Sequence, residues 1–497
     1  MRELSTAERA AVQPGGDVTR RSLTRRFSRG WLTYGLGSFV QRGIGFLLLP
    51  IYTTYLSPAE LGIVGVVLAV FSGFSVIFGL GLRGAVTRQY FDHAEAPPRL
   101  REYLGSVYTA FALYGAVGAS LLTLFGRGLF ERTLPQVPFA PFMPLALWAA
   151  FCAAAGGVLL SLYRAREQAV RYVLLELVSA VLMLGFVAYF VVVRRGGAVG
   201  QAQGLFWSSL SAFALTLVLL LREARPRCNV AMIRRAVAFG APLMVHLLAG
   251  WVLLAADRVL LARMMSLTEV GLYTLGYQIA MIMGVVASAS NAAWAPMFYD
   301  VARTHADAPR SLGRLASVNL GVSFAVGLLL ILFGREMVLV MGGERYAGAA
   351  TVVPVIVLAY ALQALYFVTV TPIFYAQQTR LLAPLTVSAA ALNVGLNILL
   401  IPRFGMIGAA WGTFIAFGFL FVAAATIARR RFAVDYEVGT LVLLFGLLIV
   451  AACAMWATAR TSLIMAAALK LTLVALYVGA CVRTGVVSRL GGAVADE

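Results

Sequence analysis

Ionisable side chains occur inside several of the long apolar stretches of this chain. Asp257 and Arg258 lie side by side in the apolar run 236–261, and Arg42 lies in the first apolar stretch. Charged groups inside a bilayer are costly and are kept mostly where they pair or line a polar cavity. An arginine offers a planar fork of donors that suits a diphosphate, whereas a carboxylate or a histidine can carry a proton. Anion binding and ion coupling are therefore the chemistry to look for.

Four arginines are candidates for contact with an anionic substrate in a cavity: Arg42, Arg83, Arg88 and Arg258. For Arg42, the alternative is a structural partner for a carboxylate on another helix. Arg83 and Arg88 follow the second apolar stretch, where membrane topology alone also explains them. Arg258 could equally fix helix packing, since adjacent helical residues point about 100° apart and Asp257 need not be its partner.

Three further residues are candidates for ion coupling or gating: Asp257, His246 and Glu176. For Asp257, the favoured alternative is a role in packing between helices. His246 lies three turns before Asp257 on almost the same helix face, and a neutral histidine bonded to a neighbouring helix is favoured over a proton relay. Glu176 could couple an ion, but pairing with a nearby arginine is favoured, the choices being Arg164, Arg166 and Arg171.

The composition restricts the class of protein. Of the 497 residues 61% are hydrophobic and 12% are charged, which is typical of a polytopic membrane protein. A net charge of +19 would suggest nucleic acid in a soluble chain, but here the arginines cluster between apolar spans, so no nucleic-acid partner is expected. The four cysteines have no metal-ligand or disulfide spacing. We expect no metal and no cofactor, with H+ or Na+ as possible coupling ions.

Apolar stretches long enough to cross a bilayer recur about fourteen times, given that a transmembrane helix needs about 20 mostly apolar residues. They lie near residues 31–53, 60–82, 104–126, 140–162, 171–193, 201–221, 238–262, 270–298, 315–341, 351–376, 383–402, 406–428, 439–459 and 462–482. We therefore predict an all-α polytopic membrane protein. The loops are short, which argues against an enzyme with a soluble catalytic domain.

One pattern occurs twice along the chain. LSPAELGIVG at 56–65 aligns with MSLTEVGLYT at 265–274, so that Glu60 matches Glu269 and Gly62 matches Gly271. At nearly the same offset, a run of four residues recurs: Arg195, Gly197, Gly200 and Gly204 match Arg403, Gly405, Gly408 and Gly412. Parallel repeats underlie several transporter folds, with substrate handled at the repeat interface. We predict two six-helix halves followed by two extra helices.

The arginines set the predicted orientation. Roughly 28 of them fall in one set of alternate loops and tails, against roughly 9 in the other set, and the richer side should be cytoplasmic. The predicted organisation is an N-terminal cytoplasmic tail (1–30), a first half (31–221), a cytoplasmic linker (222–237), a second half (238–428), two extra helices (439–482) and a C-terminal cytoplasmic tail (483–497).

Four stretches carry a resemblance to a known family. They are LLLPIYTTYLSPAELG (47–62), FGAPLMVHLLAGWVLLAADRVLLARMMSLTEVGLY (239–273), GERYAGAATVVPVIVLAY (343–360) and LNVGLNILLIPRFGMIGAAWGT (392–413). The chain resembles the polysaccharide flippase branch of the multidrug/oligosaccharidyl-lipid/polysaccharide exporter superfamily. The Asp-Arg pair followed by a Ser-x-x-Glu-x-Gly-x-Tyr turn is the most specific of these features.

The resemblance implies a function in the bacterial inner membrane. Such a protein moves a polyprenyl-diphosphate-linked oligosaccharide to the outer leaflet for exopolysaccharide, O-antigen or capsule assembly. Its partners would be this lipid-linked substrate, the bilayer, and the polysaccharide polymerase and export machinery. A drug/cation antiporter of the same superfamily and a flippase for the peptidoglycan precursor are the alternatives. A membrane polymerase or ligase, from a different class, would need a large periplasmic loop.

Replacement of Arg42 by alanine tests the first of the candidate arginines. If Arg42 contacts the diphosphate, the Arg42→Ala variant should lose glycan export while the protein remains inserted in the membrane. Export can be measured in cells, with membrane insertion checked on the same samples. Wild-type export would assign Arg42 a structural role instead.

Overall fold

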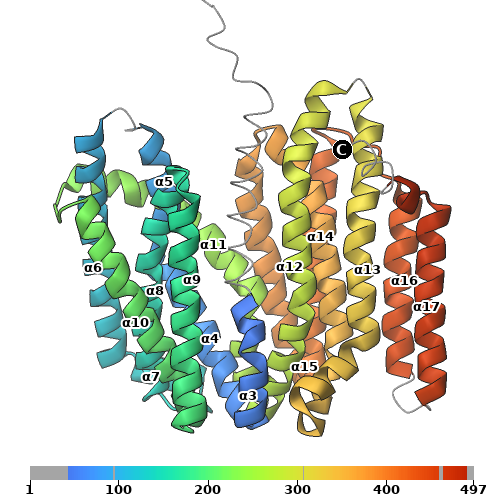
Figure 1. The fold of residues 1–497 in the computed structure, drawn as a ribbon, viewed down its shortest axis with the longest axis horizontal. Coiled ribbons are helices and arrows are strands. Elements are labelled where there is room, and N and C mark those ends of the chain that lie inside the picture. Colours follow the sequence, from blue (N-terminus) through green and yellow to red (C-terminus); the bar gives the residue numbers. More distant parts are fainter. Residues whose placement is uncertain (1–42, 93–95, 306, 458–462, 490–497) are drawn as a thin grey trace, which may run out of the picture.

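The computed structural model describes residues 43–92, 96–305, 307–457 and 463–489. Within these residues every regular element is a helix, and 89% of the structure is helical. The predicted all-α fold is therefore confirmed. Figure 1 shows the helices as a broad row of upright rods, with the first-half helices at one end and α16 and α17 at the other.

The helices follow the chain in a simple order. The first half contains α3 (Leu49–Tyr55), α4 (Pro58–Gly79), α5 (Leu82–Asp92), α6 (Pro97–Phe125), α7 (Arg127–Thr133), α8 (Phe142–Ala165), α9 (Ala169–Ala188), the π-helical η1 (Tyr189–Val193) and α10 (Gly197–Glu223). The second half contains α11 (Val230–Met264), α12 (Leu267–Thr304), α13 (Ala308–Gly342), the 3-10 helix η2 (Glu344–Thr351), α14 (Val353–Tyr375), the 3-10 helix η3 (Thr379–Leu381) and α15 (Leu382–Arg429). The extra helices are α16 (Val438–Ala457) and α17 (Leu463–Arg483).

Twelve helices of the described part of the chain are long and apolar enough to cross a membrane. One of these, α15, is broken at Gly405 (φ +56°), which separates the two spans predicted at 383–402 and 406–428. The first predicted span, 31–53, is described only from Gly43 onward. The multi-pass architecture is thus established, and the count of fourteen spans stays a prediction.

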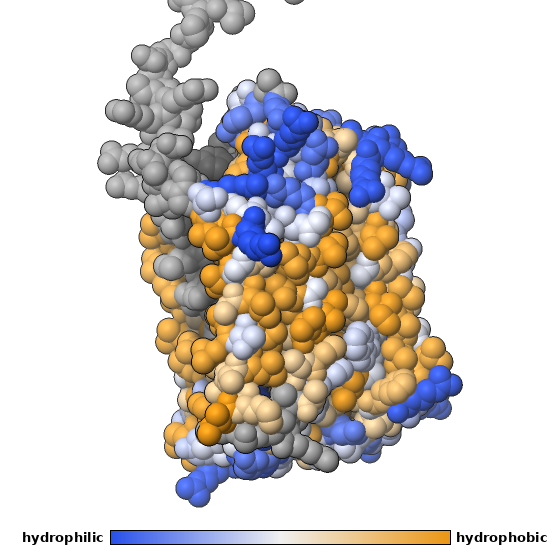
Figure 2. Space-filling model, turned by 90° about the vertical axis from the view of Figure 1, so that its right-hand side faces the viewer, coloured by the Kyte–Doolittle hydropathy of each residue, from blue (hydrophilic) through white to orange (hydrophobic). Residues whose placement is uncertain are grey.

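The two ends of the molecule differ in their connections. We call the end that carries Ser57, Ser266 and Gly405 the latch side, and the opposite end, with the connections 224–229 and 430–437, the arginine side. Figure 2 shows hydrophilic residues gathered at both ends and a broad hydrophobic belt between them. Such a belt is what a helical protein presents to the hydrocarbon core of a bilayer.

The repeated sequence pattern builds the same local structure twice. Ser57 and Glu60 form a capping box at the start of α4, and Ser266 and Glu269 form one at the start of α12. Each box satisfies backbone N–H groups that a helix end leaves unpaired. In both halves a glycine with a left-handed backbone, Gly197 or Gly405, lies against the capping glutamate. The match found in the sequence thus extends to the geometry around the two caps.

The two halves meet where α4 crosses α12. A Cβ atom added at Gly62 would overlap the carbonyl of Leu267 and lie 3.2 Å from the backbone nitrogen of Gly271. A Cβ atom at Gly271 would overlap the carbonyl of Pro58 and lie 3.0 Å from the nitrogen of Gly62. Small residues let two membrane helices approach this closely. Glycine is therefore the residue that fits at both positions.

Helix α11 runs obliquely between the two bundles (Figure 1). Its Trp251 donates a hydrogen bond to the carbonyl of Ala69 in α4 (3.0 Å), against Gly73. Earlier in α11, Gly240 packs backbone to backbone against Gly81, where α4 ends and α5 begins. The later turns of α11 contact α15 of the second half. One helix is thus anchored to both halves.

The extra helices attach to the second half through α13. The Tyr477 hydroxyl of α17 donates to the carbonyl of Gly321 in α13 (2.7 Å). Lys470 of α17 forms an ion pair with Glu336 of α13 and lies over the ring of Phe333. Both contacts hold α16 and α17 at the far edge of the molecule from the first half (Figure 1).

Substitution of either crossing glycine tests this packing. Gly62→Ala or Gly271→Ala should lower the melting temperature of the purified protein, because the methyl group has only backbone atoms to displace and overpacking costs about 1–3 kcal/mol. Gly395→Ala is the matched control, since a Cβ atom there meets nothing within 4 Å. An unchanged melting temperature for Gly62→Ala and Gly271→Ala would mean that the two backbones are not in contact.

Candidate functional site

A buried polar network surrounds Asp257 in the second half. Its Oδ1 atom accepts hydrogen bonds from the backbone nitrogen of Arg258 (2.8 Å) and from Nη1 of the same arginine (3.2 Å). The hydroxyl of Tyr273 donates to its Oδ2 atom. The residue is 1% exposed. Both carboxylate oxygens are therefore occupied, as a buried charge requires.

Arg258 is held by aromatic rings as well as by Asp257. Its guanidinium lies 4.1 Å from the ring centre of Tyr277 and 5.8 Å from that of Tyr273. Its Nη1 atom also donates to the carbonyl of Leu254 (2.9 Å), and Tyr277 receives a hydrogen bond from Tyr360 of α14 (3.1 Å). Cation–π contacts gain strength when the cation is removed from water.

This network joins α11, α12 and α14 at one level. Asp257 lies seven residues before the end of α11 and Tyr273 six residues after the start of α12, which places both about 10 Å from the latch side. The sequence left open whether Asp257 and Arg258 pair, and the structure shows that they do. In this conformation Arg258 is 9% exposed, and its Nη1 atom is already bonded within the network.

A second ionisable cluster lies in the first half, toward the arginine side. Glu176 is buried, receives a hydrogen bond from Tyr172, and interacts electrostatically with Arg83 and Arg164. The Nη2 atom of Arg164 donates to the Tyr172 hydroxyl (2.8 Å), and its guanidinium lies over the same ring. Of the three partners suggested for Glu176 by the sequence, Arg164 is thus the one that interacts with it electrostatically.

The other two arginines near Glu176 are engaged elsewhere. Arg166 forms an ion pair with Glu223 of α10 (2.7 Å). Arg171 donates a hydrogen bond to the side chain of Gln168 (3.2 Å). Glu176 therefore belongs to a cluster inside the bundle, about 10 Å from the start of α9, and not to the charged rim.

Arg83 interacts electrostatically with Glu176 and is also accessible from outside this cluster. It follows the left-handed turn at Leu80 and Gly81, so its side chain leaves α5 at the break between α4 and α5. Its guanidinium fills a notch at Gly157 of α8, where a Cβ atom would overlap it. The residue nonetheless remains exposed. Arg83 is thus a fixed cation with one face packed and another accessible.

Arg88 and His246 lie where α11 meets the first half. Arg88 is exposed, with its guanidinium 5.1 Å from the ring centre of Phe239. The Nδ1 atom of His246 is buried and has no hydrogen-bond partner in the described residues. The expected bond from His246 to a neighbouring helix is therefore not seen at Nδ1. The neighbouring Leu243 packs against Gly84, because α11 follows the first half in this stretch.

Arg42 lies outside the described residues. Of the two described glycines that follow it, Gly43 has open space where a Cβ atom would lie, and Gly45 lies against the side chain of Gln278 in α12. The described part of the chain contains no group of three metal-ligating side chains.

Hydrogen bonds join the two halves at the latch side. Arg345 of η2 donates to the carbonyls of Thr53 and Thr54, the latter at 3.1 Å. The Thr53 hydroxyl donates to the carbonyl of Met341, and the Tyr346 hydroxyl donates to that of Leu56 (2.9 Å). Burial raises the pKa of Tyr346 to about 12, so this donor keeps its proton at neutral pH. We call Thr53, Leu56, Arg345 and Tyr346 the latch.

Two more bonds reinforce the same side. The side-chain amide of Gln136 donates to the carbonyl of Met265 (2.6 Å), and Arg263 donates to the carbonyl of Arg132 (2.9 Å). In each pair one residue lies in α7 or just after it, and the other lies at the C-terminal end of α11. These contacts and the Gly62–Gly271 crossing close the latch side of the interface between the halves.

Some of these groups could be anticipated from residue spacing. Tyr273 and Tyr277 stand four residues apart after the second capping box, a spacing that places both rings on one helix face. Arg345 and Tyr346 belong to the stretch 343–360 that carries the family resemblance, but their bonds to α3 depend on tertiary contacts about 290 residues apart in sequence. No pattern in the chain predicts that pairing.

Comparison with other proteins finds a matching family model and two related proteins. A family model described as polysaccharide biosynthesis protein matches residues 27–302. An uncharacterized membrane protein of Haemophilus influenzae is 23% identical over 374 residues, 73% of this chain and 87% of the relative. Protein 1 of the Lsg locus of Haemophilus influenzae is 20% identical over 393 residues, covering 76% of this chain and 93% of the relative.

Solved structures of membrane transporters share the fold. The lipid II flippase MurJ in an inward closed conformation has a TM-score of 0.71 at 10% identity, covering 92% of this chain and 99% of its own. An inward-facing multidrug resistance MATE family transporter has a TM-score of 0.59 at 15% identity, covering 78% of this chain and 95% of its own. At these identities the likeness establishes architecture alone.

Loss of the latch should expose the interface that it covers. The reporter is Leu56→Cys, at a fully buried position, in a background without the native cysteines. In this background, Arg345→Ala should increase the rate at which an impermeant thiol reagent labels the reporter cysteine. Hydrogen bonds to charged groups contribute about 1.5–3 kcal/mol, so the labelling rate should rise roughly tenfold or more. Arg127→Ala removes an exposed arginine of the same side that pairs within one half and serves as control. Equal labelling rates in the two variants would contradict a closing role for Arg345.

Proposed function

This chain belongs to the polysaccharide biosynthesis protein family, and we propose that it is a flippase for polyprenyl-diphosphate-linked oligosaccharides. The substrate would move from the inner to the outer leaflet of the bacterial cytoplasmic membrane by alternating access between the two halves. The product would feed the polymerase and export machinery of a cell-surface polysaccharide.

The observation that carries this proposal is the position of Arg83. A diphosphate and its glycan cannot cross hydrocarbon unaided, so the protein must offer a fixed cation within the bundle. The Gly157 notch holds the Arg83 guanidinium in place while part of the side chain stays accessible. Arginine presents several N–H donors in a planar fork that matches phosphate oxygens.

The distribution of contacts between the halves supports the transport mechanism. The latch and the Gly62–Gly271 crossing close one side, whereas Arg83 lies toward the other. We assign the arginine side to the cytoplasm, following the rule that positively charged loops remain inside. The substrate would then meet Arg83 from the cytoplasm, and opening of the latch would release it outward. Both chain termini would be cytoplasmic.

Coupling to H+ or Na+ is assigned to the candidates Asp257, His246 and Glu176. In this conformation Asp257 is paired with Arg258, and Glu176 is bonded to Tyr172 and interacts electrostatically with Arg83 and Arg164. His246 has a buried Nδ1 atom without a partner in the described residues, which makes it the best placed of the three to exchange a proton.

A second candidate function rests on the fold comparison. The lipid II flippase MurJ has the same architecture over 92% of this chain at a TM-score of 0.71, so a peptidoglycan-precursor flippase is the second function that we propose to test. A drug/cation antiporter is less well supported, because a cationic substrate calls for a free carboxylate. The buried carboxylate of Asp257 is paired with Arg258, and that of Glu176 is bonded to Tyr172 and interacts electrostatically with two arginines.

A leaflet-translocation assay in proteoliposomes separates these functions. The probes are a labelled polyprenyl-diphosphate oligosaccharide, lipid II and an organic cation dye, each with and without imposed H+ and Na+ gradients. We expect the oligosaccharide lipid to move, and Arg83→Ala to slow it at least tenfold because the charge-assisted bonds to the diphosphate are lost. Arg303→Ala, an exposed arginine on the same side, is the control.

Each alternative has its own outcome in this assay. Faster movement of lipid II than of the oligosaccharide lipid would favour the peptidoglycan-precursor function. Movement of the dye alone would refute the flippase proposal. Equal rates for Arg83→Ala and wild type would remove Arg83 from the substrate path, and a gradient-independent rate would remove ion coupling.

A further inference from the structure

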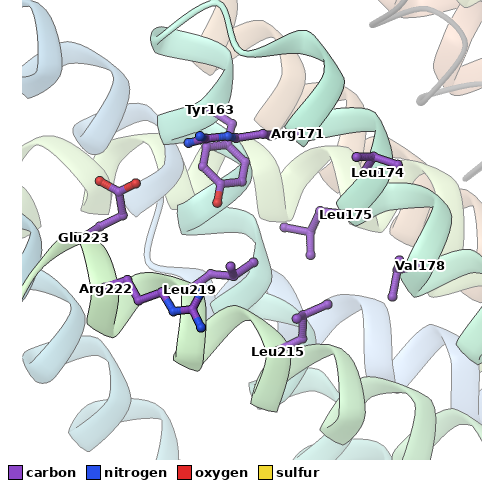
Figure 3. Close-up of a pocket in the computed structure, with 9 residues that line it drawn as sticks. All are labelled: Tyr163, Arg171, Leu174, Leu175, Val178, Leu215, Leu219, Arg222 and Glu223. Carbon is purple, nitrogen blue, oxygen red and sulfur yellow. The ribbon is translucent and has the colours of Figure 1, made fainter.

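A groove between α9 and α10 combines two arginines with an apolar floor (Figure 3). It holds about 430 Å³ and lies on the first half, toward the arginine side. Pockets of about 300–1,000 Å³ are typical of small-ligand sites. The groove is separate from the Asp257 network, which belongs to the second half.

The charged residues of the groove lie at its end nearest the arginine side. Arg171 is the third residue of α9 and Arg222 is the next-to-last residue of α10, and both are exposed. Arg222 forms no hydrogen bond or ion pair within the described residues, whereas Arg171 has one bond to Gln168. Glu223 also lines the groove, but its carboxylate is paired with Arg166 at 2.7 Å. The charge left uncompensated at the rim is therefore positive.

The floor of the groove is apolar and extends into the hydrophobic belt. Leu174 and Val178 of α9 are 55% and 40% exposed, although they face toward Leu215 and Leu219 of α10 across the groove. From Arg171 to Val178, and from Leu215 to Arg222, the helix rises by about 10 Å. A ligand would thus meet cations at one end and hydrocarbon over the next 10 Å.

We propose that this groove binds an anionic glycerophospholipid from the leaflet on the arginine side. The phosphate would lie between Arg171 and Arg222, and the first part of an acyl chain would cover Leu174 and Val178. Basic pockets between membrane helices on the arginine-rich side are suited to anionic headgroups, and each arginine contributes attraction to a negatively charged lipid surface. Both arginines lie within three residues of a helix end, the region in which a membrane helix meets the lipid headgroups.

Native mass spectrometry of the full chain tests the proposal. The protein is titrated with phosphatidylglycerol, with phosphatidylethanolamine of the same acyl chains, and with inorganic phosphate. We expect selective binding of phosphatidylglycerol, and the Arg171→Ala/Arg222→Ala double variant should bind it at least about tenfold more weakly. Inorganic phosphate should bind weakly, because it cannot use the apolar floor.

Two further variants complete the design. Arg429→Ala/Arg430→Ala removes two exposed arginines from the end of α15 on the same side and should leave phosphatidylglycerol binding within about twofold of wild type. Leu174→Trp keeps the charge and fills the groove, so it should weaken binding as well. Elution as a folded monodisperse protein is required of each variant.

Each of the following results would contradict the proposed lipid site. Equal loss in the α15 control would mean that total charge, and not the groove, attracts the lipid. Equal binding of phosphatidylethanolamine, or wild-type binding by the Arg171→Ala/Arg222→Ala variant, would reject the site. Displacement of phosphatidylglycerol from the groove by the polyprenyl-diphosphate oligosaccharide at lower concentration would assign the groove to that lipid instead.

Discussion

The close approach of α4 and α12 at Gly62 and Gly271 determines how the two halves of this protein can be arranged. Each glycine packs on the backbone of the other helix, so a side chain at either position would separate the halves. The capping boxes one turn away start both helices in the same way, which brings the two glycines to the same level. The latch bonds of Arg345 and Tyr346 then add directional contacts around this crossing. Together these contacts define the closed side of the interface, which would have to open for release of a substrate in the transport cycle that we propose.

Burial of charge is the second constraint on the structure. Asp257 and Arg258 are paired with one another and with tyrosines near the latch side, while Glu176 is bonded to Tyr172 and interacts electrostatically with Arg83 and Arg164 near the opposite side. A buried ion pair with satisfied hydrogen bonds adds little net stability but fixes which helices meet, because loss of one partner leaves a costly charge. The exposed part of Arg83 is the exception, and for that reason it is the group we assign to the substrate.

Much of this architecture could be predicted from residue patterns alone. Apolar length predicted the helical membrane fold, and the repeat of Glu60 and Gly62 at Glu269 and Gly271 predicted two related segments, in which the structure shows the same helix cap. The pairing of Asp257 with Arg258 could not be decided from sequence, since helix geometry allows adjacent side chains to diverge and only the packed tyrosines bring these two together. His246 was expected to bond to a neighbouring helix, but the path of α11 along the first half depends on contacts such as Gly81 with Gly240 that no local pattern reveals.

Cross-linking across the latch side tests most directly whether separation of the halves there is part of the transport cycle. Cysteines at Thr54 and Arg345, in a background without the native cysteines, would be joined by a short reducible cross-linker in proteoliposomes. The account predicts that cross-linking stops movement of the polyprenyl-diphosphate oligosaccharide and that reduction restores it. A cysteine pair at Arg127 and Glu131, on the same side but within one helix, should leave transport unchanged when cross-linked. Full transport with the Thr54–Arg345 cross-link in place would contradict the account.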